Sequence, residues 1–246
     1  MAPVAADLIF YPSASSPFDD ISTTGGAINT AGRLMNAILT TREKLNYVSS
    51  SASDTTVEVT VRGLSFGGLD TIERITLNGT TVIKGKAEFR RILDIALSAA
   101  AVGTVTISKQ SDSSSLRTVA AGITRYTTLF KFAYPLEGDD LVRYEKVFVK
   151  NTHGADALSE AAIALVSDSS VLSVGVAASQ GDSVTIANRR AAPSGITFES
   201  ADEYVDITGT NLNAGSSLGI WLKQTLPMNH KITEANSSFI IYIFGS

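Results

Sequence analysis

The sequence predicts a mainly β protein in which an extended N-terminal arm with a short helix precedes two antiparallel β-sandwich or barrel-like domains. Three observations lead to this fold class. Short runs of alternating apolar and polar residues recur along most of the 246 residues. Glycine, proline or asparagine separates these runs at close intervals. Charged residues make up 18% of the chain, below the usual value of about a quarter, which favours sheets and turns over long solvated helices.

Residues 1–45 differ from the rest of the chain and are expected to form the arm. Two prolines and a pair of glycines interrupt regular structure after a possible short strand over 7–11. Apolar residues at helical spacing predict one short helix within 29–45. Such an arm is either disordered or ordered by lying on a neighbouring subunit. Its apolar side chains are the candidate interface residues, namely Leu8, Ile9, Phe10, Tyr11 and Phe18.

Residues 46–115 are expected to form a small β domain. Val57, Val59 and Val61 alternate with polar residues and predict a half-buried strand. Asn78-Gly79 predicts a type I′ hairpin turn, because both residues tolerate positive φ. The run 89–97 fits helical and strand periods alike, and its β surroundings favour a strand. The serine-rich stretch 111–115 is expected to be a loop tip or a link between domains.

Residues 116–246 are expected to form a second, larger sandwich. The expected strands are 127–133, 144–150, 161–166, 171–177, 183–187, 204–207, 217–224 and 239–244. Their number and spacing are typical of an immunoglobulin-like or jelly-roll sandwich. Large residues recur at every second position within 218–222. Trp221 is therefore expected to anchor the core and not to stack on a ligand.

Residue types that perform catalysis or bind metals are scarce in this chain. Cysteine is absent, and the two histidines, His153 and His230, are expected to be loop residues with solvent or backbone partners. The acidic groups Asp19-Asp20 and Glu137-Gly-Asp-Asp140 lie beside proline or glycine and are expected in solvated turns. Phosphate-loop, dinucleotide-binding and nucleophile-elbow motifs are missing. We therefore expect no cofactor, no metal and no enzymatic activity.

The net charge of −4 argues against a protein that neutralises phosphates, so no nucleic-acid partner is expected. No apolar run approaches the ~20 residues that a membrane-spanning helix needs. The first residues lack a charged segment followed by an apolar core, so no secretory signal is expected either. The sequence thus predicts a soluble protein made in a cytoplasm.

Four segments of the chain carry a resemblance. They read YEKVFVKNTHG at 144–154, ANRRAAPSG at 187–195, TGTNLNAG at 208–215 and GIWLK at 219–223, with shorter stretches at 22–28 and 76–80. Together they resemble a family of virion structural proteins of tailed bacteriophages. The resemblance implies a virion location, the major capsid protein and further copies of this chain as partners, and no catalytic residues.

The first expectation is accordingly a capsid decoration or cement protein, a head auxiliary protein that binds the major capsid shell as a homo-oligomer. A tail, baseplate or appendage component would use the same fold equally well. A third alternative is a carbohydrate-binding or adhesive β-sandwich, in which Tyr126, Tyr134, Tyr204 or Trp221 would stack on sugar rings. An enzyme built on a converging carboxylate pair also stays open.

Overall fold

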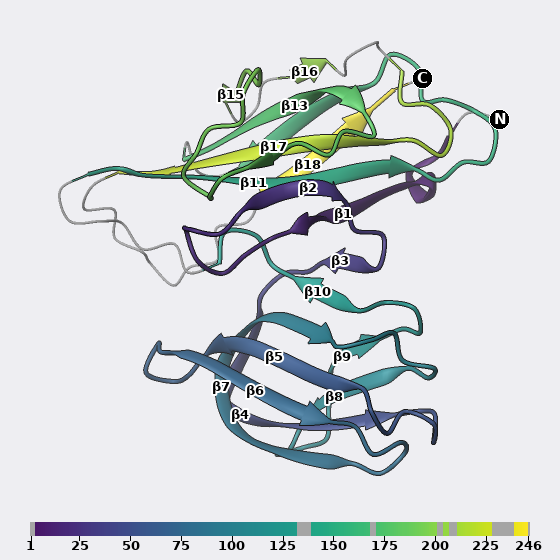
Figure 1. The fold of residues 1–246 in the computed structure, drawn as a ribbon, viewed down its shortest axis with the longest axis vertical. Helices are drawn as coiled ribbons and strands as arrows, with labels where there is room; N and C mark the ends of the chain where they lie inside the picture. The colour runs from purple at the N-terminus through teal and green to yellow at the C-terminus, as the bar shows by residue number, and fades with distance from the viewer. Residues whose placement is uncertain are drawn as a thin grey trace. The chain divides into compact units, whose positions relative to one another are not determined.

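A computed structural model describes residues 3–131, 139–167, 171–200, 204–206, 211–227 and 239–245 of the chain. The described residues are mainly strands in curled sheets, which confirms the expected β-rich class (Figure 1). The chain divides into two compact units. Unit 1 comprises Met1–Asn29 and Leu129–Ser246, and unit 2 comprises Thr30–Thr128.

These units differ from the expected consecutive segments 1–45, 46–115 and 116–246. The N-terminal residues do not form a separate arm but contribute strand β1 (Leu8–Ser15) to unit 1. There β1 pairs antiparallel with β11 (Leu141–Asn151), from Leu8 opposite Asn151 to Pro12 opposite Val147. Unit 2 is therefore an insertion between two parts of unit 1.

Unit 2 is one curled sheet. Its strands are β3 (Gly32–Leu34), β4 (Ile38–Ser49), β5 (Glu58–Leu64), β6 (Asp70–Thr76), β7 (Ile83–Leu97), β8 (Val105–Lys109), β9 (Ser115–Val119) and β10 (Arg125–Thr127). The order is β3-β10-β7-β4-β8-β9, with β5 joined to β7 and β6 joined to β5. β3 and β10 are parallel, and the other paired neighbours are antiparallel.

The helix expected within 29–45 is wrong, because β3 and β4 occupy this range. Ile38 and Leu45 are seven residues apart, a spacing that fits a helix but not an unbroken strand. A register shift between Leu39 and Glu43 resolves the conflict, since Arg42 adopts a φ of 61° there. This bulge changes the face to which later side chains point, so Leu45 is buried within the sheet core.

The expected strands of unit 2 otherwise form. Val57, Val59 and Val61 are buried, and the ambiguous run 89–97 belongs to β7. The serine-rich stretch 111–115 connects the paired strands β8 and β9 and ends at the first residue of β9, so it is a loop tip and not a link between the units.

Asn78-Gly79 forms a turn but not the expected hairpin. Thr81 N donates to Asn78 O at 3.0 Å, and Gly79 has a φ of 56°. The flanking strands part after this turn, because β6 pairs with β5. Gly79 instead exchanges backbone hydrogen bonds with Asp54 and Ser49, which seats the turn against a neighbouring loop.

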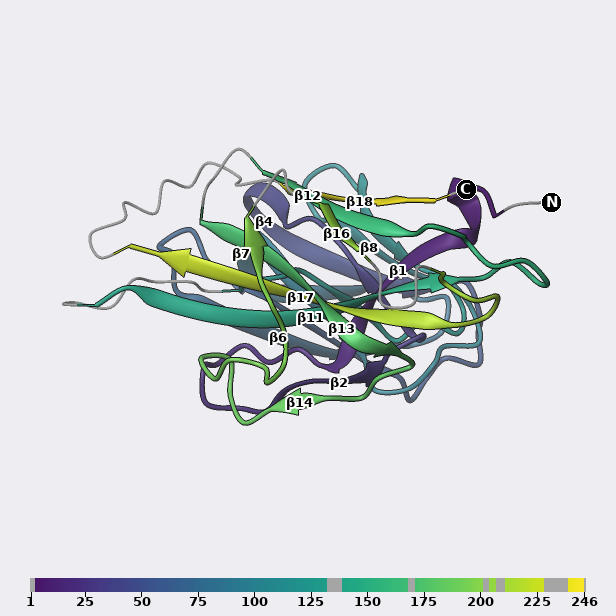
Figure 2. The ribbon, with the colours of Figure 1, turned by 90° about the horizontal axis from the view of Figure 1, so that it is seen from above.

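Unit 1 contains two sheets. Its further strands are β2 (Thr24–Ile28), β12 (Ala162–Ser167), β13 (Leu172–Gln180), β14 (Thr185–Ile186), β15 (Glu199–Ser200), β16 (Tyr204–Asp206), β17 (Ser217–Leu226) and β18 (Phe239–Phe244), preceded by a 3-10 turn at Ala5–Asp7. The larger sheet has the order β14-β2-β1-β11-β17-β13-β15, and the smaller has the order β16-β12-β18. Figure 2 shows the smaller sheet as a separate layer over β11, β13 and β17.

The centre of unit 1 is the antiparallel pair β11–β17, which runs from Leu141 opposite Leu226 to Lys150 opposite Ser217. Both strands are buried on both faces. Trp221 is fully buried and packs with Tyr144 and Ile186, so its expected role as a core anchor is confirmed.

Candidate functional site

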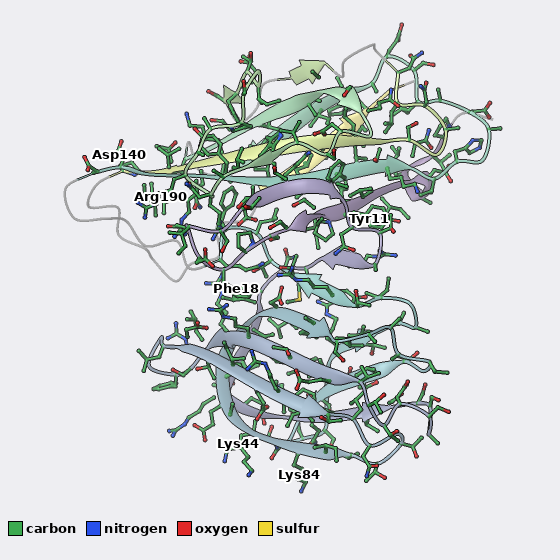
Figure 3. The ribbon with its side chains drawn as sticks, viewed as in Figure 1. Tyr11, Phe18, Lys44, Lys84, Asp140 and Arg190 are labelled. Carbon is green, nitrogen blue, oxygen red and sulfur yellow. The ribbon has the colours of Figure 1, made fainter. Side chains whose placement is uncertain are left out.

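The five candidate interface residues lie within unit 1, and Figure 3 labels two of them, Tyr11 and Phe18. Leu8, Ile9 and Phe10 are half-buried in β1, and Tyr11 is only 6% exposed. Phe18 is half-buried in the loop after β1, and the Lys131 ammonium lies 4.5 Å from its ring centre. These side chains are thus partly occupied by contacts within their own unit.

His153 accepts backbone hydrogen bonds in the loop after β11. Its Nδ1 atom lies 2.9 Å from Asp156 N and 3.3 Å from Ala155 N. The expectation of a backbone-bonded loop histidine is confirmed for this residue. His230 lies outside the described residues, as do two residues of the acidic turn that ends at Asp140.

Asp19 and Asp20 play different parts, although they are neighbours in the loop between β1 and β2. Asp19 behaves as expected for a turn: its carboxylate accepts hydrogen bonds from Ile21 N and from Ser22 N and Oγ. Asp20 turns inward and contacts the guanidinium groups of three arginines, so the expectation of a solvated turn is wrong for Asp20.

We use the name charge cluster for Asp20, Lys131, Arg143, Glu145, Arg189 and Arg190. Asp20 Oδ2 lies 2.7 Å from Arg143 Nη2 and 3.1 Å from Arg190 Nη2, and Oδ1 lies 3.8 Å from Arg189 Nη1. Burial alone would raise the pKa of Asp20, but the hydrogen bonds and charges of these arginines outweigh it and hold the pKa below its ordinary 3.8.

Arg189 is fully buried at the centre of this cluster. It forms an ion pair with Glu145, which also accepts a hydrogen bond of 2.9 Å from Phe130 N. Arg143 and Arg189 both donate to the backbone oxygen of Lys131. The cluster therefore joins the β1–β2 loop, the start of β11 and the loop that carries Arg189 and Arg190, the last of which is labelled in Figure 3.

A second buried charge is Lys146, on strand β11 of the larger sheet. Its ammonium donates to Asp182 Oδ1 at 2.5 Å, to Gly26 O at 3.1 Å and to Val184 O at 3.2 Å. The same ammonium lies 5.4 Å from the ring centre of Trp221. Burial lowers the pKa of Lys146, and the hydrogen bond and charge of Asp182 oppose that shift. All three donors are used, so this group fixes β2 and the Asp182 loop to β11.

The clearest accessible apolar surface of unit 2 is the turn between β5 and β6. Phe66 and Leu69 are 63% and 72% exposed there, and Ile72 follows on the outer face of β6. The Arg42 guanidinium lies 5.9 Å from the Phe66 ring centre. We call Phe66, Leu69 and Ile72 the hairpin tip. Its exposure makes it a surface that a partner could cover.

Unit 1 has its own apolar surface on β18. Ile240, Tyr242 and Phe244 alternate along the outer face of this strand and are all exposed. The rings of Tyr242 and Phe244 are stacked, with centres 6.0 Å apart and planes inclined by 21°. Sequence reasoning found this strand but not its exposure, because its six residues are all apolar and no polar positions mark an outer face.

Within the described ranges, no three His, Cys, Asp or Glu side chains converge as metal ligands would. No helix in that part of the chain has the length and apolar character needed to cross a membrane.

Comparisons with known proteins give no family for the chain. No protein-family model matches it, and no curated protein matches it. A solved structure with some similarity is the crystal structure of the Lactobacillus farciminis oxalate decarboxylase formate complex, at 8% sequence identity. The likeness covers 94% of this chain and 88% of that chain, with a TM-score of 0.13. A likeness at this level carries no argument about fold or function.

Proposed function

We propose that this chain is a structural protein of a tailed-phage virion, namely a capsid decoration or cement protein that binds the major capsid shell. The observation that carries the proposal is the resemblance of the four segments named above. Three of them meet in unit 1. Residues 144–154 include most of β11, and residues 219–223 lie in its partner strand β17. Arg189, from the segment 187–195, forms an ion pair with Glu145 of β11.

Some residues of these segments lie in the interior of unit 1. Trp221, Arg189 and Lys146 are buried, so these three residues of the segments support the interior of unit 1. We further propose that unit 1 is a sandwich of the immunoglobulin-like or jelly-roll type. Recognition of a particular shell then falls to exposed residues.

The hairpin tip and the outer face of β18 are the surfaces that we propose for contacts in the particle. Each is small, and one small apolar surface binds weakly. A shell presents many equivalent sites, so an oligomer that contacts several of them gains from effective concentration. Leu8, Ile9 and Phe10 keep part of their surface accessible and belong to the same proposal.

The carbohydrate-binding alternative loses one of its four aromatic candidates. Trp221 is fully buried and offers no face to a sugar ring. Tyr126 is half-buried, and the Arg117 guanidinium lies 5.0 Å from its ring centre. The side chains of Tyr134 and Tyr204 lie outside the described residues.

Co-sedimentation with empty capsids of the phage that encodes the chain tests the proposal. Deleting residues 1–40 is unsuitable, since it removes β1, β2 and β3 and so damages the fold of both units. Phe66→Asp with Leu69→Asp alters accessible side chains only, and we expect at least a tenfold loss of capsid binding. Val102→Asp, at a 71% exposed loop residue of unit 2, is the control. Wild-type protein that does not sediment with capsids would contradict the proposal.

A further inference from the structure

Lys146 and Asp182 form a buried pair in unit 1 that the proposed virion role does not use. Lys146 lies on β11, and Asp182 lies in the loop between β13 and β14. Their side chains are 0% and 6% exposed, and the ammonium nitrogen lies 2.5 Å from Oδ1 of the carboxylate. A buried amine this close to a buried carboxyl group is a nucleophile held beside an electrophile.

The surroundings of this pair favour its uncharged form. The Lys146 Nζ atom lies 4.8 Å from the ring centre of Phe148 and 5.4 Å from that of Trp221. Removing two charges from water is costly, and a neutral amine beside a neutral acid avoids most of that cost. Burial lowers the pKa of Lys146, although the hydrogen bond and charge of Asp182 oppose this shift. Lys146 therefore loses a proton more readily than an exposed lysine does.

Two backbone carbonyl groups orient the amine. Lys146 Nζ donates to Gly26 O at 3.1 Å and to Val184 O at 3.2 Å. A neutral amine has two N–H bonds and one lone pair. Because the two carbonyl oxygens accept from both N–H bonds, the lone pair takes the third direction, which is that of the Asp182 carboxyl group.

The two carboxylate oxygens of Asp182 have different environments. Oδ1 accepts a hydrogen bond of 2.9 Å from Val184 N in addition to the one from Lys146. Oδ2 is buried and has no hydrogen-bond donor in the described part of the chain. A buried oxygen without a donor is costly, especially when it carries charge. An amide keeps only one of the two oxygens, so loss of Oδ2 as water removes the unsatisfied atom.

Gly219 on β17 leaves the space that this pair occupies. A Cβ atom at position 219 would lie 2.3 Å from Asp182 Oδ2 and 2.7 Å from Lys146 Cε. Both distances are far inside van der Waals contact, so a larger residue would push the two side chains away from their present positions. The glycine thus allows the amine and the carboxyl group to stay in contact.

We propose that Lys146 Nζ and Asp182 Cγ join in an intramolecular amide bond, with release of one water molecule. The ammonium group first passes a proton to the carboxylate, where Oδ2 is the more basic oxygen because it lacks the hydrogen bonds that Oδ1 accepts. The amine nitrogen then attacks Cγ, and Val184 N–H stabilises the negative charge that develops on Oδ1. A second amine proton passes to the Oδ2 hydroxyl, the Cγ–Oδ2 bond breaks, and water leaves. The reaction requires no further reagent.

This bond does not depend on the virion role, because it needs no capsid. It ties β11 covalently to the loop between β13 and β14, and the ion pair is the state that precedes it. Variants that lack either partner lack the bond as well. Differences in stability among such variants therefore report the ion pair alone.

Intact-mass spectrometry of the purified full-length protein, denatured before measurement, tests the proposal. We expect the native chain to be lighter than its sequence by one water molecule, and Lys146→Met and Asp182→Ala each to have the full mass of their sequences. Lys84→Met, at an exposed lysine of unit 2, is the control and should keep the loss. Fragmentation of proteolytic peptides should place the lost water between Lys146 and Asp182.

A native chain of full sequence mass after prolonged incubation at neutral pH would overturn the proposal and leave an ordinary ion pair. A loss of water that persists in Lys146→Met would also overturn it, since an aspartate can instead lose water to its own backbone as a succinimide. Trp221 fluorescence checks that the variants fold. The mass and peptide fragments of the native chain decide the question even if a variant does not fold.

Discussion

The hydroxyl of Tyr47 on β4 donates a hydrogen bond of 2.7 Å to Oε2 of Glu73 on β6. The two strands are not neighbours, since β5 and β7 lie between them in the sheet order. Oε1 of the same carboxylate accepts from Lys86 N and Ala87 N at the start of β7. One buried side chain thus closes the curl of unit 2, by bonding to backbone that β5 leaves unpaired. Burial, followed by the Glu73 charge and hydrogen bond, raises the pKa of Tyr47, so its hydroxyl stays a donor.

Replacing Glu73 should weaken the contact that its carboxylate makes between β4, β6 and the start of β7. Glu73→Ala leaves the Tyr47 hydroxyl and two backbone amides without an acceptor, and we expect a loss of about 3 kcal/mol of unfolding free energy. Glu73→Gln keeps an acceptor and should lose less. Urea unfolding and hydrogen exchange of the peptide that holds Lys86 and Ala87 measure both effects. Glu58→Ala, at an exposed carboxylate on β5, is the control. Unchanged exchange at Lys86 in Glu73→Ala would refute the closure.

Gly85 makes room for that carboxylate. A Cβ atom at this position would lie 2.2 Å from Glu73 Oε2, far inside van der Waals contact. Gly85→Ala should therefore destabilise the protein, while Gly67→Ala, where the nearest atom is 4.0 Å away, should not. In the double variant with Glu73→Ala the penalty should shrink, because the clashing atoms are gone. Strict additivity of the two losses would show that Gly85 acts in another way.

Acid should weaken unit 1 through Asp20. Its pKa in the folded protein lies below the ordinary 3.8, so the stability it contributes is fully present above that value. This contribution is lost as the pH falls through the lower folded pKa, where the arginines lose their carboxylate partner. Asp20→Asn should reduce stability at neutral pH and flatten the dependence on pH below ~4. Thermal unfolding from pH 2 to 7 tests this, and parallel curves for both proteins would contradict it.

The contribution of the Lys146–Asp182 ion pair to the free energy of unfolding should depend on both partners together. Lys146→Ala leaves the Asp182 carboxylate buried without its cation, and we expect a loss of about 3 to 5 kcal/mol. Lys146→Met combined with Asp182→Ala removes both charges and should lose much less. Fluorescence of Trp221, the single tryptophan in the chain, follows unfolding of unit 1 and should change on loss of the ammonium near its ring. A double variant as unstable as Lys146→Ala would rule out this explanation.

Strand positions and side-chain burial that follow from local sequence patterns could be predicted from the sequence. Val57, Val59 and Val61 alternate within one strand, so burial of these side chains follows from period two. The strand 239–244 also has the predicted bounds, although its six residues are all apolar and show no alternation. The bulge at Arg42 broke that period and produced the mistaken helix.

Relationships between distant residues could not be predicted. Nothing near Leu8 indicates that it pairs with Asn151, and nothing near Asp20 indicates three arginines that lie more than a hundred positions further along the chain. The pairing of Asp20 with Arg143 depends on sheet order, which a single sequence does not encode locally. The hairpin tip is a partial exception, since Phe66 and Leu69 flank two glycines of a turn, where exposure is expected.

The location of the protein in the intact particle tests the virion proposal most directly. Electron cryomicroscopy of particles that carry a labelled copy of this chain should show the label in a repeated pattern over the whole capsid shell. Label confined to the tail or to a single vertex would contradict the decoration role, and particles without label would contradict the virion role altogether.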